Sequence, residues 1–168
     1  MRKTTLILWV FILYIIQNIF YPILTISGIV PDLLLGFTVS YGALERKFRN
    51  ISRVIIICAI LSGIGTGRVF SVAMIMVGFA GIAAYLITGY LQFIPRIIRT
   101  QTVTAIFAFL MSCAEYFALF GTITYGFVIN TAVWHTAYTT IFSIIIYLLI
   151  KKSTNTVDNK ILLTQERE

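Results

Sequence analysis

The sequence has few charged residues, and this scarcity excludes most soluble classes of protein. Charged residues make up 11% of the 168 residues and hydrophobic residues make up 59%, whereas a typical soluble domain is about one-quarter charged. Too little polar surface is available to cover a globule of this length, and the mean hydropathy is +0.95. The composition therefore predicts an integral membrane protein.

Cysteine, histidine and acidic residues are also too few for most catalytic or metal sites. The chain has two cysteines, one histidine and six acidic residues. Cys58 and Cys113 both lie inside apolar runs, which favours packing as small hydrophobic residues over a disulfide. Glu115 and His135 fit no metal-ligand spacing and no nucleophile–base motif. We therefore expect no cofactor, no metal and no enzymatic activity.

Ionisable residues inside apolar spans still need an explanation, because each is costly in lipid unless it is paired or hydrated. For Glu115 and His135 we favour polar contacts between helices, for instance with Asn130. A position of Glu115 near the outer end of its helix is another interpretation, and a proton relay is a weaker alternative.

Basic residues outnumber acidic ones, which gives a formal net charge of +7. A nucleic-acid-binding surface would need basic residues spread along a soluble face. Here they fall in short clusters between apolar runs, so we expect membrane lipids and no nucleic acid as partners.

The apolar runs predict a bundle of six transmembrane helices. The predicted spans cover residues 4–21, 31–44, 51–64, 70–91, 102–120 and 125–150. The first run is interpreted as a retained span, since no small-residue signal-peptide cleavage site follows it. Residues 1–152 then form one all-α transmembrane domain, and the polar residues 153–168 form a flexible cytoplasmic tail.

The basic residues set the orientation of this predicted bundle. With the N-terminus inside, 12 of the 13 basic residues fall on the cytoplasmic side and only Arg68 falls outside. Positive charge is concentrated on the cytoplasmic side of membrane proteins. The sequence therefore predicts six crossings with both termini in the cytoplasm.

The second span begins with a proline–acid pair, Pro31 and Asp32. Proline suits the first turn of a helix, and a carboxylate there faces the positive end of the helix dipole and accepts from free N–H groups. The span is only about 20 Å long against a hydrocarbon core of about 30 Å. This pair marks a helix start, and it is also our first candidate for a functional position.

Small residues recur in the fourth span, among them Gly78, Gly81 and Ala84. Such residues let helix backbones approach closely in lipid, so we expect this span to be the packing centre of the bundle. The alternating glycines from Gly63 to Gly67 are interpreted as a helix-ending turn, because no Lys-Ser/Thr pair follows to form a phosphate loop.

Several of these segments together resemble the rod shape-determining protein MreD family. They are PDLLL at residues 31–35, GFAGIAAYLITGYL at 78–91, CAEYFALF at 113–120 and INTAVW at 129–134. The resemblance extends over most of the chain, with PDLLL as its distinctive part. The sequence departs from the family where the third span exits, since ILSGIGTGRVFS has no Asp.

The resemblance implies a non-enzymatic scaffold subunit of the cell-elongation complex in the bacterial cytoplasmic membrane. Its partners would be an MreC-like protein, a RodA-like transglycosylase, a class B penicillin-binding transpeptidase and the MreB filament. By the same resemblance, the family positions fall on Pro31, Asp32, Glu115 and Asn130. The alternative is the substrate-binding subunit of an energy-coupling-factor vitamin transporter, although residues 4–21 lack the Ala or Gly pair used for docking in those subunits.

Overall fold

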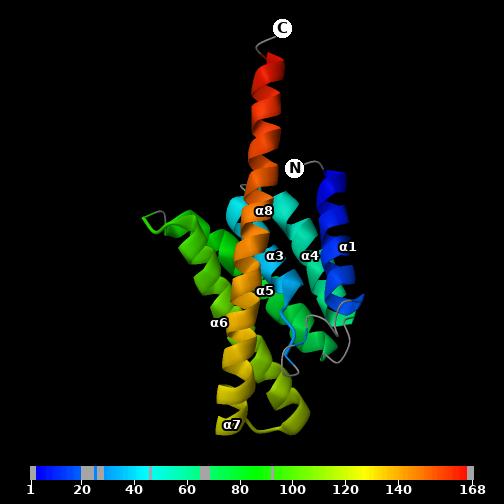
Figure 1. Ribbon diagram of the computed structural model, residues 1–168, viewed down its shortest axis with the longest axis vertical. Coiled ribbons are helices and arrows are strands. Elements are labelled where there is room, and N and C mark those ends of the chain that lie inside the picture. The colour runs from blue at the N-terminus through cyan, green and yellow to red at the C-terminus, as the bar shows by residue number, and fades with distance from the viewer. Residues whose placement is uncertain are drawn as a thin grey trace.

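A computed structural model of the chain describes residues 3–19, 25, 29–45, 47–64, 69–91 and 93–165. The regular structure of these residues is helical, so the prediction of an all-α fold is confirmed (Figure 1). The helices are α1 (Lys3–Ile19), α3 (Leu33–Leu44), α4 (Phe48–Ile64), α5 (Phe70–Tyr90), α6 (Arg96–Phe120), α7 (Tyr125–Phe127), the π-helical segment η1 (Val128–Ala132) and α8 (Val133–Gln165).

Among the described residues, three helical stretches are long and apolar enough to cross a membrane: Phe70–Tyr90, Arg96–Phe120 and Tyr125–Ser153. Leu6–Ile19 and Leu33–Leu44 are apolar but shorter. The six crossings, and the cytoplasmic placement of both termini, stay predictions.

The outer surface of the bundle is apolar. Leu8 on α1, Ile56 on α4, Phe79 on α5 and Ile141 on α8 are all more than half exposed. Water-soluble monomers rarely expose apolar side chains over such a continuous area. This is the surface expected of a bundle surrounded by lipid.

Helix α3 lies at the centre of the bundle. Every residue from Leu33 to Ala43 is buried, and α3 contacts α1, α4, α5, α6 and α8. A helix that is apolar on all sides is stable only when it is enclosed. The fourth span, which we expected to be the packing centre, is now α5; it packs against α3, α4 and α6 but leaves much of its apolar surface outside, so the enclosed helix is α3.

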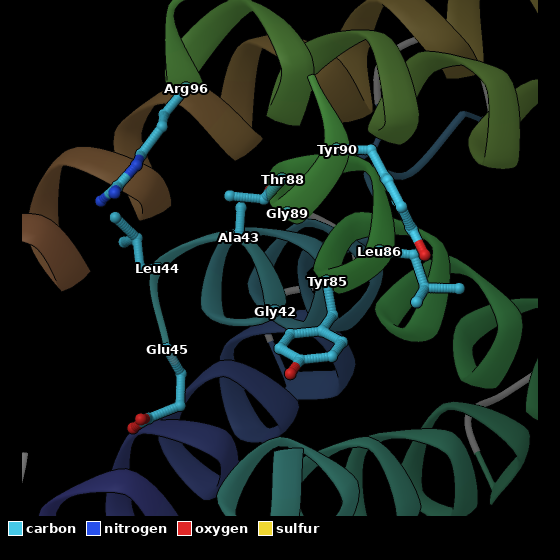
Figure 2. Close-up of a pocket in the computed structure, with 10 residues that line it drawn as sticks. All are labelled: Gly42, Ala43, Leu44, Glu45, Tyr85, Leu86, Thr88, Gly89, Tyr90 and Arg96. Atoms are coloured by element: carbon cyan, nitrogen blue, oxygen red, sulfur yellow. The ribbon is translucent and has the colours of Figure 1, made fainter. Parts of the chain in front are cut away.

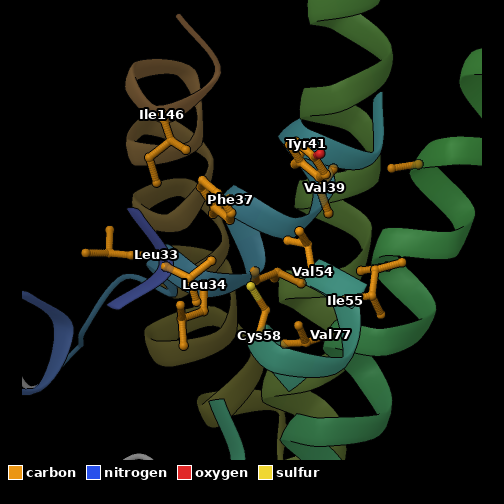
Figure 3. Packing of buried hydrophobic residues seen from close by; sticks show 14 of the residues in the cluster. Leu33, Leu34, Phe37, Val39, Tyr41, Val54, Ile55, Cys58, Val77 and Ile146 are labelled. Carbon is orange, nitrogen blue, oxygen red and sulfur yellow. The ribbon is translucent and has the colours of Figure 1, made fainter. Parts of the chain in front are cut away.

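The core forms around α3, and side chains from α1, α4, α5, α6 and α8 contribute to it. Figure 3 shows Leu34 and Phe37 of α3 among side chains of the surrounding helices, with Val54 and Cys58 contributed by α4. Cys58 is fully buried, and both Cys58 and Cys113 are free thiols.

Helix α6 begins six residues earlier than the sequence indicated. We expected residues 92–101 to be a connection, because Pro95 can break a helix and Arg96 and Arg99 are charged. Instead α6 starts directly after Pro95, and Arg99 points back to donate from Nη1 to the carbonyl oxygen of Thr88 at 2.8 Å. The arginine therefore stabilises the negative C-terminal end of α5, which offsets its cost in α6.

The last helix also differs from its expected bounds. The backbone stays helical to Gln165, well beyond residue 150, where we expected the span to end. Likewise, α4 begins at Phe48, three residues before the expected position. The glycine-rich turn at residues 65–68, including Arg68, lies outside the described residues.

The helices alternate in direction, so the ends of several helices meet at one end of the bundle. Figure 1 shows the end of α3, the start of α4, the end of α5 and the start of α6 at the same end. These segments include Lys47, Arg49, Arg96 and Arg99. Basic residues that are far apart in sequence therefore share one end of the molecule.

Candidate functional site

The N-terminus of α3 is buried inside the bundle, where its free backbone N–H groups are met by side chains. Asp32 is the N-cap residue and is 1% exposed. Its Oδ1 accepts a hydrogen bond from the N–H of Leu35 at 2.9 Å, which satisfies one donor that a helix start leaves free. Pro31, immediately before it, has no N–H to satisfy. The pair therefore suits a helix start that lies away from water.

A second acceptor comes from α1. Oε1 of Gln17 accepts from the N–H groups of Leu33 at 3.1 Å and of Leu34 at 3.3 Å. Gln17 is itself buried. The first three N–H groups of α3 thus have side-chain acceptors, which matters because an unpaired buried donor costs about 1–3 kcal/mol.

Helix α8 reaches the same point through Thr139. The backbone N–H of Asp32 donates to Oγ1 of Thr139 at 3.1 Å, and Thr139 is fully buried. We call Gln17, Asp32 and Thr139 the α3 cap cluster. Non-helical backbone at membrane depth is tolerated only where the protein or water satisfies it. The cluster satisfies the backbone at the start of α3 with side chains of Gln17, Asp32 and Thr139. Its hydrogen bonds thereby connect α1 and α8 to α3.

Polar side chains continue along the same face of α8 at intervals of four residues. Nδ1 of His135 lies 2.7 Å from Oγ of Ser112 on α6. Oγ of Ser143 lies 3.2 Å from Oγ1 of Thr104 on the same helix. With Thr139 between them, His135 and Ser143 form what we call the α8 polar stripe. Hydrogen bonds of this kind hold helices together in an apolar environment.

The hydroxyl of Ser112 lies within hydrogen-bond distance of two groups, Nδ1 of His135 and a carbonyl oxygen of its own helix. The Ser112 hydroxyl donates to the carbonyl oxygen of Ala108 at 3.0 Å. The tautomer of His135 decides whether its Nδ1 donates to Oγ of Ser112 or accepts from it. Glu115 is half-buried and lies about one turn after Ser112 on α6. A proton relay between Glu115 and His135 stays a prediction.

Asn130 lies on the outside of the bundle. It is exposed and belongs to η1, the π-helical segment at Val128–Ala132. Single π-helical turns are rare and are frequently found at functional sites. Asn130 thus presents a polar amide on the outer surface, away from the α3 cap cluster.

The small residues of the fourth span divide between an inner and an outer face. A Cβ atom added at Gly81 would lie 2.6 Å from Cγ1 of Ile55 and 2.7 Å from Cγ2 of Thr38, and Ala84 is also buried. A Cβ at Gly78 would meet no described atom within 4 Å. Gly81 therefore lies in a close contact with α3 and α4, whereas Gly78 faces outward.

Gly42 on α3 lies at the same crossing. A Cβ there would come within 2.7 Å of the backbone oxygen of Gly81. The two glycines mark the closest approach of α3 and α5.

Two members of the α3 cap cluster, Gln17 and Thr139, were not among the residues singled out from the sequence. Each is a polar residue in an otherwise apolar run, and that was the available signal. Both side chains accept from N–H groups at the start of α3. Spacing along the sequence could not show this, because Thr139 is 107 residues from Asp32.

In the part of the chain that the structure describes, no group of three His, Cys, Asp or Glu side chains could hold a metal ion. The fold and the site define a helical bundle with an apolar exterior and polar contacts between its helices. Comparison with protein-family models, with curated proteins and with solved structures finds no match for this chain.

Proposed function

We propose that this protein is a non-enzymatic, MreD-like scaffold subunit of the bacterial cell-elongation complex, embedded in the cytoplasmic membrane. In this role it supports cell shape and lateral peptidoglycan synthesis by holding partners together within the bilayer. The partners are an MreC-like protein, a RodA-like transglycosylase, a class B penicillin-binding transpeptidase and the MreB filament.

The observation that carries this proposal is the place of the PDLLL segment. It forms the start of α3, which contacts five other helices in the described part of the chain, and its Asp32 belongs to the α3 cap cluster. The segment that most resembles the family thus begins the central helix of the bundle. A scaffold needs such a fixed centre, because its partners bind to faces whose positions the centre sets.

The outer faces supply surface for partner helices. Trp134 and Val133 at the start of α8 are exposed, as is Asn130 one turn before them. Helices associate in lipid through close packing and hydrogen bonds between polar side chains. An exposed amide among apolar side chains is a suitable contact for a neighbouring transmembrane helix.

Affinity purification from native membranes tests this proposal. The tagged protein should recover the MreC-like protein, and depleting the protein should convert rods into rounded cells. Asn130→Leu should weaken the recovery at unchanged abundance, while Ile56→Leu, a conservative change at an exposed position on α4, should not. Recovery of an energy-coupling transporter module in place of the elongation proteins would contradict the proposal and favour the vitamin-transporter alternative.

A further inference from the structure

A groove opens at the basic end of the bundle, between the last turns of α3 and α5 and the first turn of α6. Its volume is about 450 Å³. Figure 2 shows the residues around it, which include Ala43, Leu44, Tyr85, Gly89, Tyr90 and Arg96. The groove is separate from the α3 cap cluster, which lies at the opposite end of α3.

One wall of this groove is apolar and aromatic. Leu86 lines it and is 47% exposed, so the wall continues onto the outer apolar surface of α5. Tyr85 packs its ring on Phe48 with centroids 5.5 Å apart, and Tyr90 is 82% exposed. Tyrosine side chains of this kind are typical of the membrane–water interface, where one end is apolar and the other is hydrated.

The cationic group of the groove is Arg96. Its side chain is exposed, and its guanidinium makes no hydrogen bond or ion pair with the described part of the chain. It lies in the first turn of α6, where Pro95 provides no side-chain cap and the helix dipole adds positive potential. Behind it, Arg99 is buried, with Nη1 bonded to the Thr88 carbonyl and Nε without a partner.

The acid beside the groove is already engaged. Oε2 of Glu45 accepts from the hydroxyl of Tyr41 at 3.0 Å, and Oε1 accepts from the N–H of Lys47 at 3.1 Å. Figure 2 shows its carboxylate pointing away from Arg96. On the side of α8, the neighbour of Arg96 and Arg99 is Tyr147. The Glu45 carboxylate lines the groove, but the two arginines, Arg96 and the buried Arg99 behind it, outnumber this one acid.

We propose that this groove binds the headgroup phosphate of an anionic phospholipid, with the guanidinium of Arg96 as the principal contact. A guanidinium matches phosphate oxygens with two parallel N–H donors. The acyl region of the lipid lies along Leu44 and Leu86, where the groove joins the outer apolar surface. A free phosphate would make no use of that wall, which is why the lipid is the favoured ligand. The proposal rests on the membrane location of the bundle and not on its role in cell elongation.

Native mass spectrometry of the detergent-purified full chain tests this proposal, with phosphatidylglycerol as the probe and phosphatidylcholine as the comparison. The wild-type protein should retain phosphatidylglycerol in preference to phosphatidylcholine. Arg96→Gln should lower this retention about tenfold, as expected for the loss of a charge-assisted contact. Arg49→Gln removes the same charge from an exposed position at the same end, and it should leave retention unchanged.

A second pair of variants keeps every charge and tests the shape of the groove. Gly89 lines the groove, and a Cβ there would meet no described atom within 4 Å, so Gly89→Phe should fill the groove and lower retention without disturbing the core. Gly78→Phe occupies open space elsewhere on α5 and is the matched control.

Three results would overturn the proposal. They are equal losses in Arg96→Gln and Arg49→Gln, equal retention of the two lipids, and unchanged retention in both Arg96→Gln and Gly89→Phe. Displacement of the lipid by inorganic phosphate at millimolar concentration would assign the site to free phosphate and contradict the lipid part. Because the readout uses purified protein, none of these results depends on recovery of the elongation partners.

Discussion

Asp32 acts on α3 through its side-chain oxygen, which accepts from the N–H of Leu35. Asn offers a similar oxygen at the N-cap position, so Asp32→Asn should keep the fold. Asp32→Leu leaves that buried N–H without its acceptor and should lower the free energy of unfolding by about 1 kcal/mol or more. The midpoint of thermal unfolding of the purified protein measures the difference. A leucine variant as stable as wild type would show that the cap contributes nothing.

The same pair of variants separates structure from function. If the charge of Asp32 serves a partner, Asp32→Asn should lose co-purification of the MreC-like protein at normal abundance. If Asp32 is purely structural, Asp32→Asn should support normal rods. Cell shape and recovery of the partner, measured in a strain depleted of the native copy, decide between these roles.

Gly81 and Gly78 allow a matched test of packing, since they are one turn apart on one helix and face opposite environments. Gly81→Leu would push a side chain against Ile55 and Thr38, whereas Gly78→Leu would enter open space. Overpacking a close contact typically costs about 1–3 kcal/mol. The amount of folded protein in the membrane should therefore fall for Gly81→Leu and stay near wild type for Gly78→Leu. Equal accumulation would mean that the close approach of α5 to α3 and α4 is incidental.

Among the helices, α3 shows what sequence pattern can and cannot predict. Its start at Pro31–Asp32 and its end before the basic cluster were readable, because proline, an acid and the end of an apolar run are local signals. Its central position was not inferred, although the run LLLGFTVSYGAL is apolar on all sides. The small residues of α5 led us to expect the packing centre there instead. In the structure, Gly81 among these residues packs against α3.

The errors at helix ends have a tertiary cause. Arg96 and Arg99 made residues 92–101 resemble a connection, but Arg99 has its carbonyl partner on α5. Similarly, Gln17 and Thr139 cap a helix that is distant from both in sequence. Contacts between different helices decide where these helices begin and how their ends are capped. The residues that make such contacts are far apart in the sequence, so local sequence patterns do not reveal them.

The α8 polar stripe predicts that hydroxyl groups on this helix differ in importance according to their face. Thr139→Val removes the acceptor for the N–H of Asp32 and should lower the unfolding free energy by about 1–2 kcal/mol. Thr140→Val is the matched control, since Oγ1 of Thr140 donates only within its own helix, to the carbonyl of Thr136 at 2.7 Å. Thermal unfolding in detergent compares them, and equal midpoints would argue against a link between α3 and α8 at Thr139.

At the scale of the whole molecule, the distribution of charge predicts the orientation of the bundle. The segments that carry Lys47, Arg49 and Arg96 meet at one end, and Figure 1 shows α7 and the end of α6 at the opposite end. Placing the basic end in the cytoplasm satisfies the preference of positive charge for that side. Both the lipid groove and the scaffold role depend on this orientation, so it is the central claim of the account.

Labelling of single cysteines in intact cells with an impermeant thiol reagent tests this claim most directly. In a background with Cys58 and Cys113 replaced by Ala, suitable positions are Lys47, Arg96, Lys152, Thr122 and Gly126, all of which are exposed. Arg99 is unsuitable, because its burial would prevent labelling on either side of the membrane. Cysteines at Lys47, Arg96 and Lys152 should react only after the membrane is permeabilised, and those at Thr122 and Gly126 should react in intact cells. Reaction at Lys47 from outside, or protection at Gly126, would contradict the account.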